Sequence, residues 1–127
     1  MKKTKIIIID DDFTLGEFMQ EKINEIENYC CELIFSDPLT FINKPVEADI
    51  YLLDVVMTNL NGLEMIEQIL KIYPSSKIIM NTFKDDPDTI FKALKMGALG
   101  YIDKQTFENN FLTVYSRQYS EPPLILN

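Results

Sequence analysis

Residues 6–12 read Ile-Ile-Ile-Ile-Asp-Asp-Asp, and this stretch decides the class of fold. Four apolar residues without polar alternation are typical of a strand that is buried on both faces. The same pattern recurs at residues 50–53 (Ile-Tyr-Leu-Leu) and 78–80 (Ile-Ile-Met). Strands buried on both faces occur in parallel sheets that are covered by helices. The sequence therefore predicts an α/β fold.

Amphipathic stretches separate the predicted strands, with apolar residues at helical spacing. Two of them open with Asp-Pro, at residues 37–38 and 86–87, which is typical of an N-cap followed by proline at the first helical position. The alternation implies right-handed crossovers and a single doubly wound parallel sheet. The predicted strands span residues 5–9, 30–35, 50–53, 77–81 and 99–102, and the predicted helices span residues 15–26, 37–42, 63–73, 86–97 and 107–115.

Length and composition indicate one domain. The chain has 127 residues, of which 46 % are hydrophobic and 25 % charged, the balance of an ordinary globular protein. We expect the domain to span residues 1–119, and residues 120–127 to be a C-terminal tail or the start of a linker to a missing output domain. No apolar run approaches the roughly 18 residues of a transmembrane helix, and the run behind Met1-Lys2-Lys3 is too short for a signal peptide. We therefore expect a cytoplasmic protein without membrane contact.

The charged composition excludes several kinds of function. The net charge is −8, and because an acidic surface repels a phosphate backbone, we expect this chain to bind no nucleic acid. The sequence contains no histidine, which excludes Ser-His-Asp catalysis, imidazole metal ligands and a phosphohistidine on this chain. Cys30 and Cys31 are adjacent, and since a disulfide between neighbours is strained, we expect both to be buried, reduced strand residues.

Acidic residues directly follow two of the predicted strands. Asp10, Asp11 and Asp12 follow the first strand, and Asp54 follows the third. If these strands are neighbours, their carboxylates lie close together and favour a bound cation, for which Mg²⁺ is the natural choice. The alternative for residues 10–12 is a solvated loop whose charges lie at a helix N-terminus. Asp54 is harder to explain in that way, because it borders an apolar core.

Two further polar side chains follow later strands. Thr82 follows the fourth strand, and Lys104 follows the fifth. Alone, each is usually a helix cap or a solvated charge. With Asp10 and Asp54 they place two acids, a hydroxyl and an ammonium at the edge of the sheet where ligands bind. Such a set would bind Mg²⁺ and a phosphoryl group together.

From residue 6 to residue 119, the sequence resembles the receiver domain of two-component response regulators. The resemblance implies a flavodoxin-like fold with strand order 2-1-3-4-5. It also implies a phosphoryl-accepting signalling protein that switches state and is not a turnover enzyme. The matching segments are residues 6–12 (IIIIDDD), residues 53–57 (LDVVM) with residues 61–63 (NGL), residues 81–82 (NT) and residues 97–104 (GALGYIDK).

The resemblance implies a role for each acidic residue of the site. Asp54 would be the phosphoacceptor, and the donor would be a partner histidine kinase. Asp11 would bind Mg²⁺ directly, Asp10 would bind it through water, and Asp54 and the backbone carbonyl of Val56 would complete the protein ligands.

The resemblance also implies how phosphorylation of the site changes a surface of the domain. Thr82 would donate a hydrogen bond to a phosphoryl oxygen, and Lys104 would pair with the phosphoryl charge. Tyr101 would be an aromatic switch that turns inward when Thr82 moves. The surface made of the fourth helix, fifth strand and fifth helix would change as a result, and a homodimer could form through it.

Several positions depart from the commonest pattern of the family. Thr58 and Gln105 stand where many receivers have proline. Gln105, together with Gly-Tyr-x-x-Lys at residues 100–104, favours the NarL/LuxR-type branch, whose output domains regulate transcription. Phe83 is bulky and should slow exchange with small phosphoryl donors. Val56 is apolar and would not position an attacking water, which predicts a long-lived phosphorylated state.

Two alternatives stay open. Residues 10–14 (Asp-Asp-Asp-Phe-Thr) also fit the D-x-D-x-T pattern of haloacid dehalogenase-like phosphatases, in which Asp10 would be the nucleophile, although no G-D-x-x-x-D segment follows. The second alternative is a non-phosphorylated interaction module that keeps the receiver fold. The presence of every expected site residue argues against it.

Overall fold

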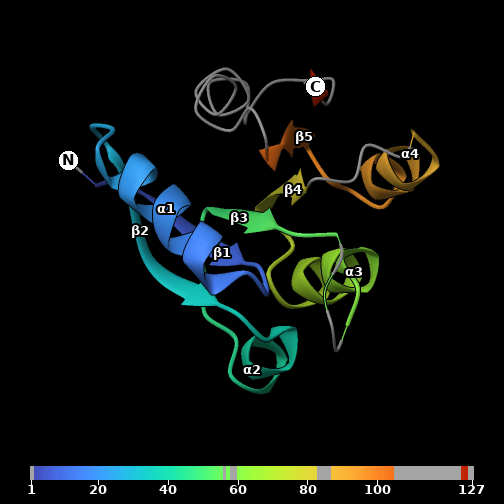
Figure 1. Cartoon of the computed structure of the whole chain (residues 1–127). Helices are drawn as coiled ribbons and strands as arrows, with labels where there is room; N and C mark the ends of the chain where they lie inside the picture. Colours follow the sequence, from blue (N-terminus) through green and yellow to red (C-terminus); the bar gives the residue numbers. More distant parts are fainter. Residues whose placement is uncertain (1, 56, 58–59, 83–86, 105–123, 126–127) are drawn as a thin grey trace.

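A parallel β-sheet organises the chain in this computed structural model, which describes residues 2–55, 57, 60–82, 87–104 and 124–125. Within those residues the sheet has 6 strands in the order β2-β1-β3-β4-β5-β6, and every pairing is parallel. The predicted order 2-1-3-4-5 is confirmed, and the sheet continues beyond it with β6 (Figure 1). The strands are β1 (Thr4–Ile9), β2 (Tyr29–Phe35), β3 (Ile50–Leu53), β4 (Lys77–Thr82), β5 (Gly100–Asp103) and β6 (Leu124–Ile125).

Helices cover both faces of this sheet. The described helices are α1 (Phe13–Asn24), α2 (Pro38–Asn43), α3 (Gly62–Ile72) and α4 (Pro87–Lys95). Buried residues of α1 pack on one face, and those of α2, α3 and α4 pack on the other (Figure 1). The helix predicted over residues 107–115 lies outside the described residues.

The unbroken apolar run of β1 serves both layers of the core. Ile6 and Ile8 pack with α1, whereas Ile7 and Ile9 pack with α2, α3 and α4, because successive side chains of a strand point to opposite faces. All four isoleucines are 0 % exposed. The interpretation of this run as a strand buried on both faces is confirmed.

Local signals in the sequence set several helix boundaries. The Asp12 side chain accepts a hydrogen bond from the Leu15 N–H, and Asp37 caps α2 in the same way, with Pro38 in the first turn. Gly97 follows α4 at φ +116°, the conformation that a helix C-terminus demands of glycine. α1 ends at Asn24, before the predicted end, and the Asn24 amide both donates to and accepts from the backbone of Cys31.

Strand register places Asp10 beside Asp54. Ile9 lies opposite Leu53 in the pairing of β1 with β3, and the Asp54 N–H donates to the Ile9 carbonyl over 3.0 Å. β1 has β2 on one side and β3 on the other, so the connections after β1 and after β2 lead to opposite sides of β1 and the strand order reverses there. The carboxyl end of β1 is therefore the switch point at which sheets of this kind bind ligands.

The two cysteines and the last residues of the chain differ in part from expectation. Cys31 is buried as expected, whereas Cys30 is only half-buried, and both thiols are free. Residues 120–127 were expected to form a tail or linker, and two of them, Leu124–Ile125, form β6. None of the described helices is long and apolar enough to span a bilayer.

Candidate functional site

Three carboxylates gather at the carboxyl ends of β1 and β3. Asp10, Asp11 and Asp54 each offer one ligand oxygen, and these atoms all lie within 4.8 Å of one another. Asp10 is 1 % exposed and Asp54 is 5 % exposed, whereas Asp11 faces solvent. The cluster predicted from the sequence is thus present, with two members in the protein interior. Hard carboxylate oxygens at this spacing suit a divalent cation such as Mg²⁺.

Lys104 lies between the two buried carboxylates. Its ammonium nitrogen is 2.6 Å from Asp10 Oδ2 and 3.3 Å from Asp54 Oδ2, and its side chain is 4 % exposed. The sequence predicted that Lys104 would face a phosphoryl group on Asp54, and here its shorter contact is to Asp10. Buried charges survive only when they are paired, so this lysine is part of the structure of the site.

Burial raises the pKa of Asp10 to about 6, from an ordinary value of 3.8. The hydrogen bond from Lys104, the hydrogen bond from the Asp12 N–H (2.9 Å) and the charge of Lys104 oppose this rise, while the charge of Asp54 adds to it. Desolvation therefore outweighs the single lysine. A second cation at the cluster would stabilise the ionised form of Asp10 further.

Gly62 holds the backbone of Asp54 in place, a role that the sequence reasoning missed. A Cβ at Gly62 would lie 2.4 Å from the Asp54 carbonyl oxygen and 2.7 Å from Val55 Cα. The Gly62 N–H donates to the Val55 carbonyl over 2.8 Å. Only glycine allows the N-terminus of α3 to pack this closely against the chain that carries Asp54. Its place directly after the helix cap Asn61 was the available signal.

The remaining predicted residues lie at or near the same edge. Thr82 is the last residue of β4 and pairs with Asp103, so its backbone lies at the carboxyl edge. Tyr101 lies on β5 and is 1 % exposed, so its ring is already inside the core. Val56, like the positions that mark a departure from the family pattern, lies outside the described residues. Four strand ends do meet at this edge, as predicted.

Asn81 is a second residue whose importance the sequence reasoning missed. It precedes Thr82 on β4 and is 1 % exposed. Its amide donates to Met19 Sδ over 2.6 Å, while its Oδ1 has no hydrogen-bond partner among the described residues. An asparagine inside an otherwise apolar strand was the signal for it. A buried amide of this kind lowers stability next to the site.

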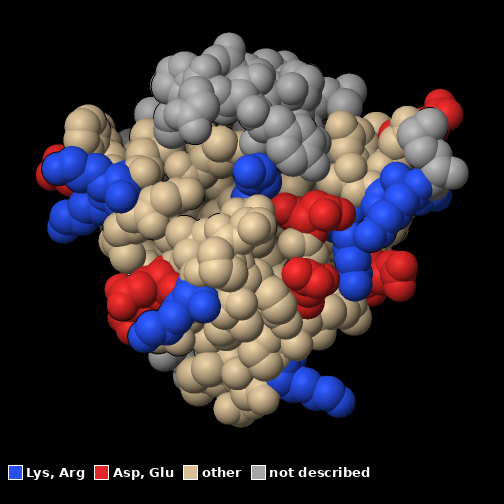
Figure 2. Space-filling view, turned by 180° about the vertical axis from the view of Figure 1, so that it is seen from behind, with Lys and Arg blue, Asp and Glu red and all other residues tan. Residues whose placement is uncertain are grey.

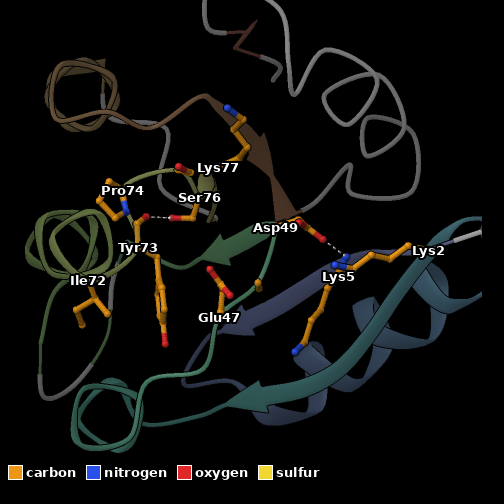
Figure 3. A pocket seen from close by; sticks show the side chains of 11 residues that line it. Lys2, Lys5, Glu47, Asp49, Ile72, Tyr73, Pro74, Ser76 and Lys77 are labelled. Carbon is orange, nitrogen blue, oxygen red and sulfur yellow. Dashed lines mark hydrogen bonds between the residues drawn. The ribbon is translucent and has the colours of Figure 1, made fainter.

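A groove of about 470 Å³ lies at the opposite end of the sheet. Figure 3 shows side chains of both charges around it, and the Asp49 carboxylate there accepts the Lys5 N–H over 2.7 Å. The face seen in Figure 2 likewise intersperses acidic and basic side chains, without a continuous basic surface among its described residues. The groove is lined by Lys2, Lys5, Glu47, Ala48, Asp49, Ile72, Tyr73, Pro74, Ser75, Ser76 and Lys77.

Comparison with known families agrees with this geometry. The sequence model of the response regulator receiver domain family matches residues 6–115. The chain belongs to this family. Receiver domains are phosphoryl-accepting signalling switches, and their acidic site binds Mg²⁺. The assignment favours the receiver interpretation over the phosphatase alternative.

Among curated relatives, the receiver is similar to parts of longer proteins and to nearly the whole length of another. It is 27 % identical over 120 residues to a protein-glutamate methylesterase/protein-glutamine glutaminase of Nitrosomonas europaea, covering 91 % of this chain and 34 % of that protein. It is 29 % identical to Protein CcdB of Bacillus subtilis, covering 90 % of this chain and 96 % of that protein. The chain thus spans about a third of the methylesterases that it matches.

Solved structures share the fold. The receiver domain of RcsB from Escherichia coli has a TM-score of 0.87 at 20 % identity, covering 99 % of this chain and all of that one (100 %). The response regulator domain of CheB from Thermotoga maritima has a TM-score of 0.83 at 19 % identity, and the match covers 96 % of this chain and 100 % of that one. Receivers described as NarL and as an OmpR/PhoB homolog are also similar, so the fold does not single out one branch of the family.

Proposed function

We propose that Asp54 accepts a phosphoryl group from the phosphohistidine of a partner kinase, in a Mg²⁺-dependent reaction. The observation that carries this proposal is the placement of Asp54, 5 % exposed, within reach of two further carboxylates and the ammonium of Lys104. A buried carboxylate with cations around it can act as a nucleophile toward phosphorus without accumulating negative charge.

The residues of this chain divide the chemistry of the transfer between them. A carboxylate oxygen of Asp54 attacks phosphorus, so that an oxygen–phosphorus bond forms while the nitrogen–phosphorus bond of the donor breaks. Lys104, already 3.3 Å from Asp54, stabilises negative charge on the phosphoryl oxygens. Thr82, at the end of the neighbouring strand β4, donates a hydrogen bond to one of these oxygens. The donor histidine comes from the partner, because this chain has none.

The acidic cluster fits Mg²⁺ by donor type and spacing. Asp11 would bind the ion directly, Asp10 through water, and Asp54 and the Val56 carbonyl would supply further oxygens. When bound, Mg²⁺ adds positive charge that offsets the charge of the phosphoryl oxygens. The exposed position of Asp11 leaves the cluster open to solvent and to the kinase.

Phosphorylation then changes a surface beside the site. Thr82 and Tyr101 link the site to β5 and α4, and with the helix predicted over residues 107–115 these form the proposed output and homodimer surface. We propose a cytoplasmic receiver of the NarL/LuxR-type branch that controls a transcription output domain. It acts as a switch and not as a turnover enzyme. Apolar Val56 supports a long-lived phosphorylated state, and loss of the phosphoryl group within seconds would contradict that part.

Intact mass spectrometry tests the site. The protein is incubated with Mg²⁺ and acetyl phosphate, and wild type is compared with Asp54→Asn and with Asp49→Asn, a matched change at the opposite end of the sheet. We expect wild type and Asp49→Asn to gain one phosphoryl group and Asp54→Asn to gain none. A phosphoryl group on Asp10 would favour the phosphatase alternative. If neither acetyl phosphate nor beryllofluoride binds, the chain is an interaction module.

A further inference from the structure

The family match ends at residue 115, yet residues beyond it return to the sheet. In β6, Leu124 lies opposite Gly100 of β5, and Ile125 lies opposite Tyr101, in a parallel pairing at the edge of the sheet (Figure 1). On its other side, β5 pairs with β4 from Gly100 to Asp103. A segment outside the family match is therefore attached to the strand that carries Tyr101.

The position of β5 decides where Lys104 can reach. β5 ends at Asp103, and the next residue is Lys104, whose ammonium contacts Asp10 over 2.6 Å and Asp54 over 3.3 Å. Because a strand advances by about 3.3 Å per residue, the contact of β6 at Tyr101 lies roughly 10 Å along the chain from Lys104. A shift of β5 at Tyr101 would therefore move the lysine relative to both carboxylates.

We propose that β6 is a clamp on β5 and that its docking is coupled to the phosphoryl group on Asp54. This inference rests on the proposed function and adds a regulatory element to it. Docked β6 holds β5 where Lys104 reaches the acidic site. A phosphoryl group on Asp54 draws Lys104 toward it and so stabilises the same position of β5. By thermodynamic linkage, docking and phosphoryl binding then strengthen each other by the same factor.

The described contacts make β6 an element that can detach. It pairs through two residues, Leu124 and Ile125, at one edge of the sheet, which provides few ladder hydrogen bonds. Pairings of this size open at much lower free energy than the centre of a sheet. A modest coupling is then enough to change the docked fraction. The C-terminal segment would be held more firmly when Asp54 is phosphorylated.

Beryllofluoride, a mimic of the phosphoryl group, tests the coupling. Its affinity for the full chain with Mg²⁺ is measured by ¹⁹F NMR of bound fluoride. The double variant Leu124→Ser/Ile125→Ser is compared with Ile72→Ser, which replaces an exposed apolar residue at the far end of the sheet. We expect the double variant to bind beryllofluoride about threefold to tenfold more weakly, and Ile72→Ser to bind it as wild type does.

Hydrogen exchange on the wild-type protein gives a second, independent measurement. We expect beryllofluoride to slow amide exchange at Gly100, Tyr101 and residues 124–125. The clamp is overturned if wild type binds beryllofluoride while exchange at these amides is unchanged, or if the folded double variant binds as tightly as wild type. If wild type binds no beryllofluoride, the proposed function itself fails and the coupling fails with it. The two failures are therefore distinguishable.

Discussion

Replacing Lys104 by methionine should reveal how the buried charges of the site are balanced. The methionine side chain is slightly shorter and replaces most of the packing of the lysine stem, but Asp10 and Asp54 lose the ammonium that lies 2.6 Å and 3.3 Å away. Removing one member of a buried ion pair costs about 3–5 kcal/mol, because the other charge stays buried without compensation. Here two carboxylates are left, so we expect the free energy of unfolding to fall by about that amount at neutral pH without divalent ions.

Urea unfolding followed by circular dichroism measures this loss. Lys71→Met, a change to an exposed lysine of α3, should alter stability by less than about 0.5 kcal/mol. Excess Mg²⁺ should restore more stability to Lys104→Met than to wild type, because the ion replaces the missing charge at the carboxylates. In an Asp10→Asn background the cost of Lys104→Met should shrink, since one of the stranded charges is gone.

A loss below about 1 kcal/mol for Lys104→Met would refute this reasoning. It would mean that the lysine contributes no more than a surface ion pair does, and that the carboxylates are solvated despite their burial. If Mg²⁺ stabilises wild type and Lys104→Met equally, the idea that the metal and the lysine compensate the same carboxylate charges is refuted.

Three further predictions concern residues around the site. The folded state raises the pKa of Asp10 to about 6, so the folded protein holds the proton of Asp10 more tightly than the unfolded chain does. The contribution of Asp10 to the free energy of unfolding is therefore complete below pH 4 and is lost as the pH rises to about 6. Urea unfolding between these pH values should show this loss of stability, and Asp10→Asn should make stability less dependent on pH. Gly62→Ala should lower the free energy of unfolding by about 1–3 kcal/mol and weaken beryllofluoride binding, because the Cβ of the alanine would press on the Asp54 carbonyl. A folded Gly62→Ala variant that binds beryllofluoride with wild-type affinity would contradict this prediction. Asn81→Leu should raise the melting temperature or leave it unchanged, because it removes a buried amide oxygen that has no hydrogen-bond partner among the described residues. A loss of stability above about 2 kcal/mol would show that the donor bond of the amide to Met19 is needed.

Features of the fold that depend on a short stretch of sequence could be predicted. Four consecutive isoleucines can be buried only if both faces of β1 are covered, and with two similar runs separated by amphipathic stretches this indicates a parallel sheet with helices on both sides. Asp-Pro at residues 37–38 fixed the start of α2, because the side chain and the proline ring act on the adjacent backbone. The convergence of Asp10 and Asp54 followed from the strand order.

What could not be predicted depends on distances between segments that are remote in sequence. Lys104 was expected to face Asp54. Its shorter contact to Asp10 depends on where β5, which is separated from β3 by β4, places the lysine relative to the ends of β1 and β3. The close approach of Gly62 to Asp54 has the same origin. β6 has two apolar residues and hence no periodicity to detect, so its existence depends wholly on the edge that β5 offers.

Buried polar groups that lower the stability of the fold are concentrated, among the described residues, at the carboxyl edge of the sheet. Asp10 is buried with a raised pKa, and Asn81 keeps an amide oxygen without a partner among the described residues. Interior residues away from this edge, such as Ile6 to Ile8, are apolar and fully buried. A site with unbalanced charge is stabilised by any ligand that supplies the missing charge, which lets ligand binding shift the neighbouring strands. If β5 is one of those strands, as its direct connection to Lys104 suggests, a two-residue strand at its outer edge is weak enough to respond.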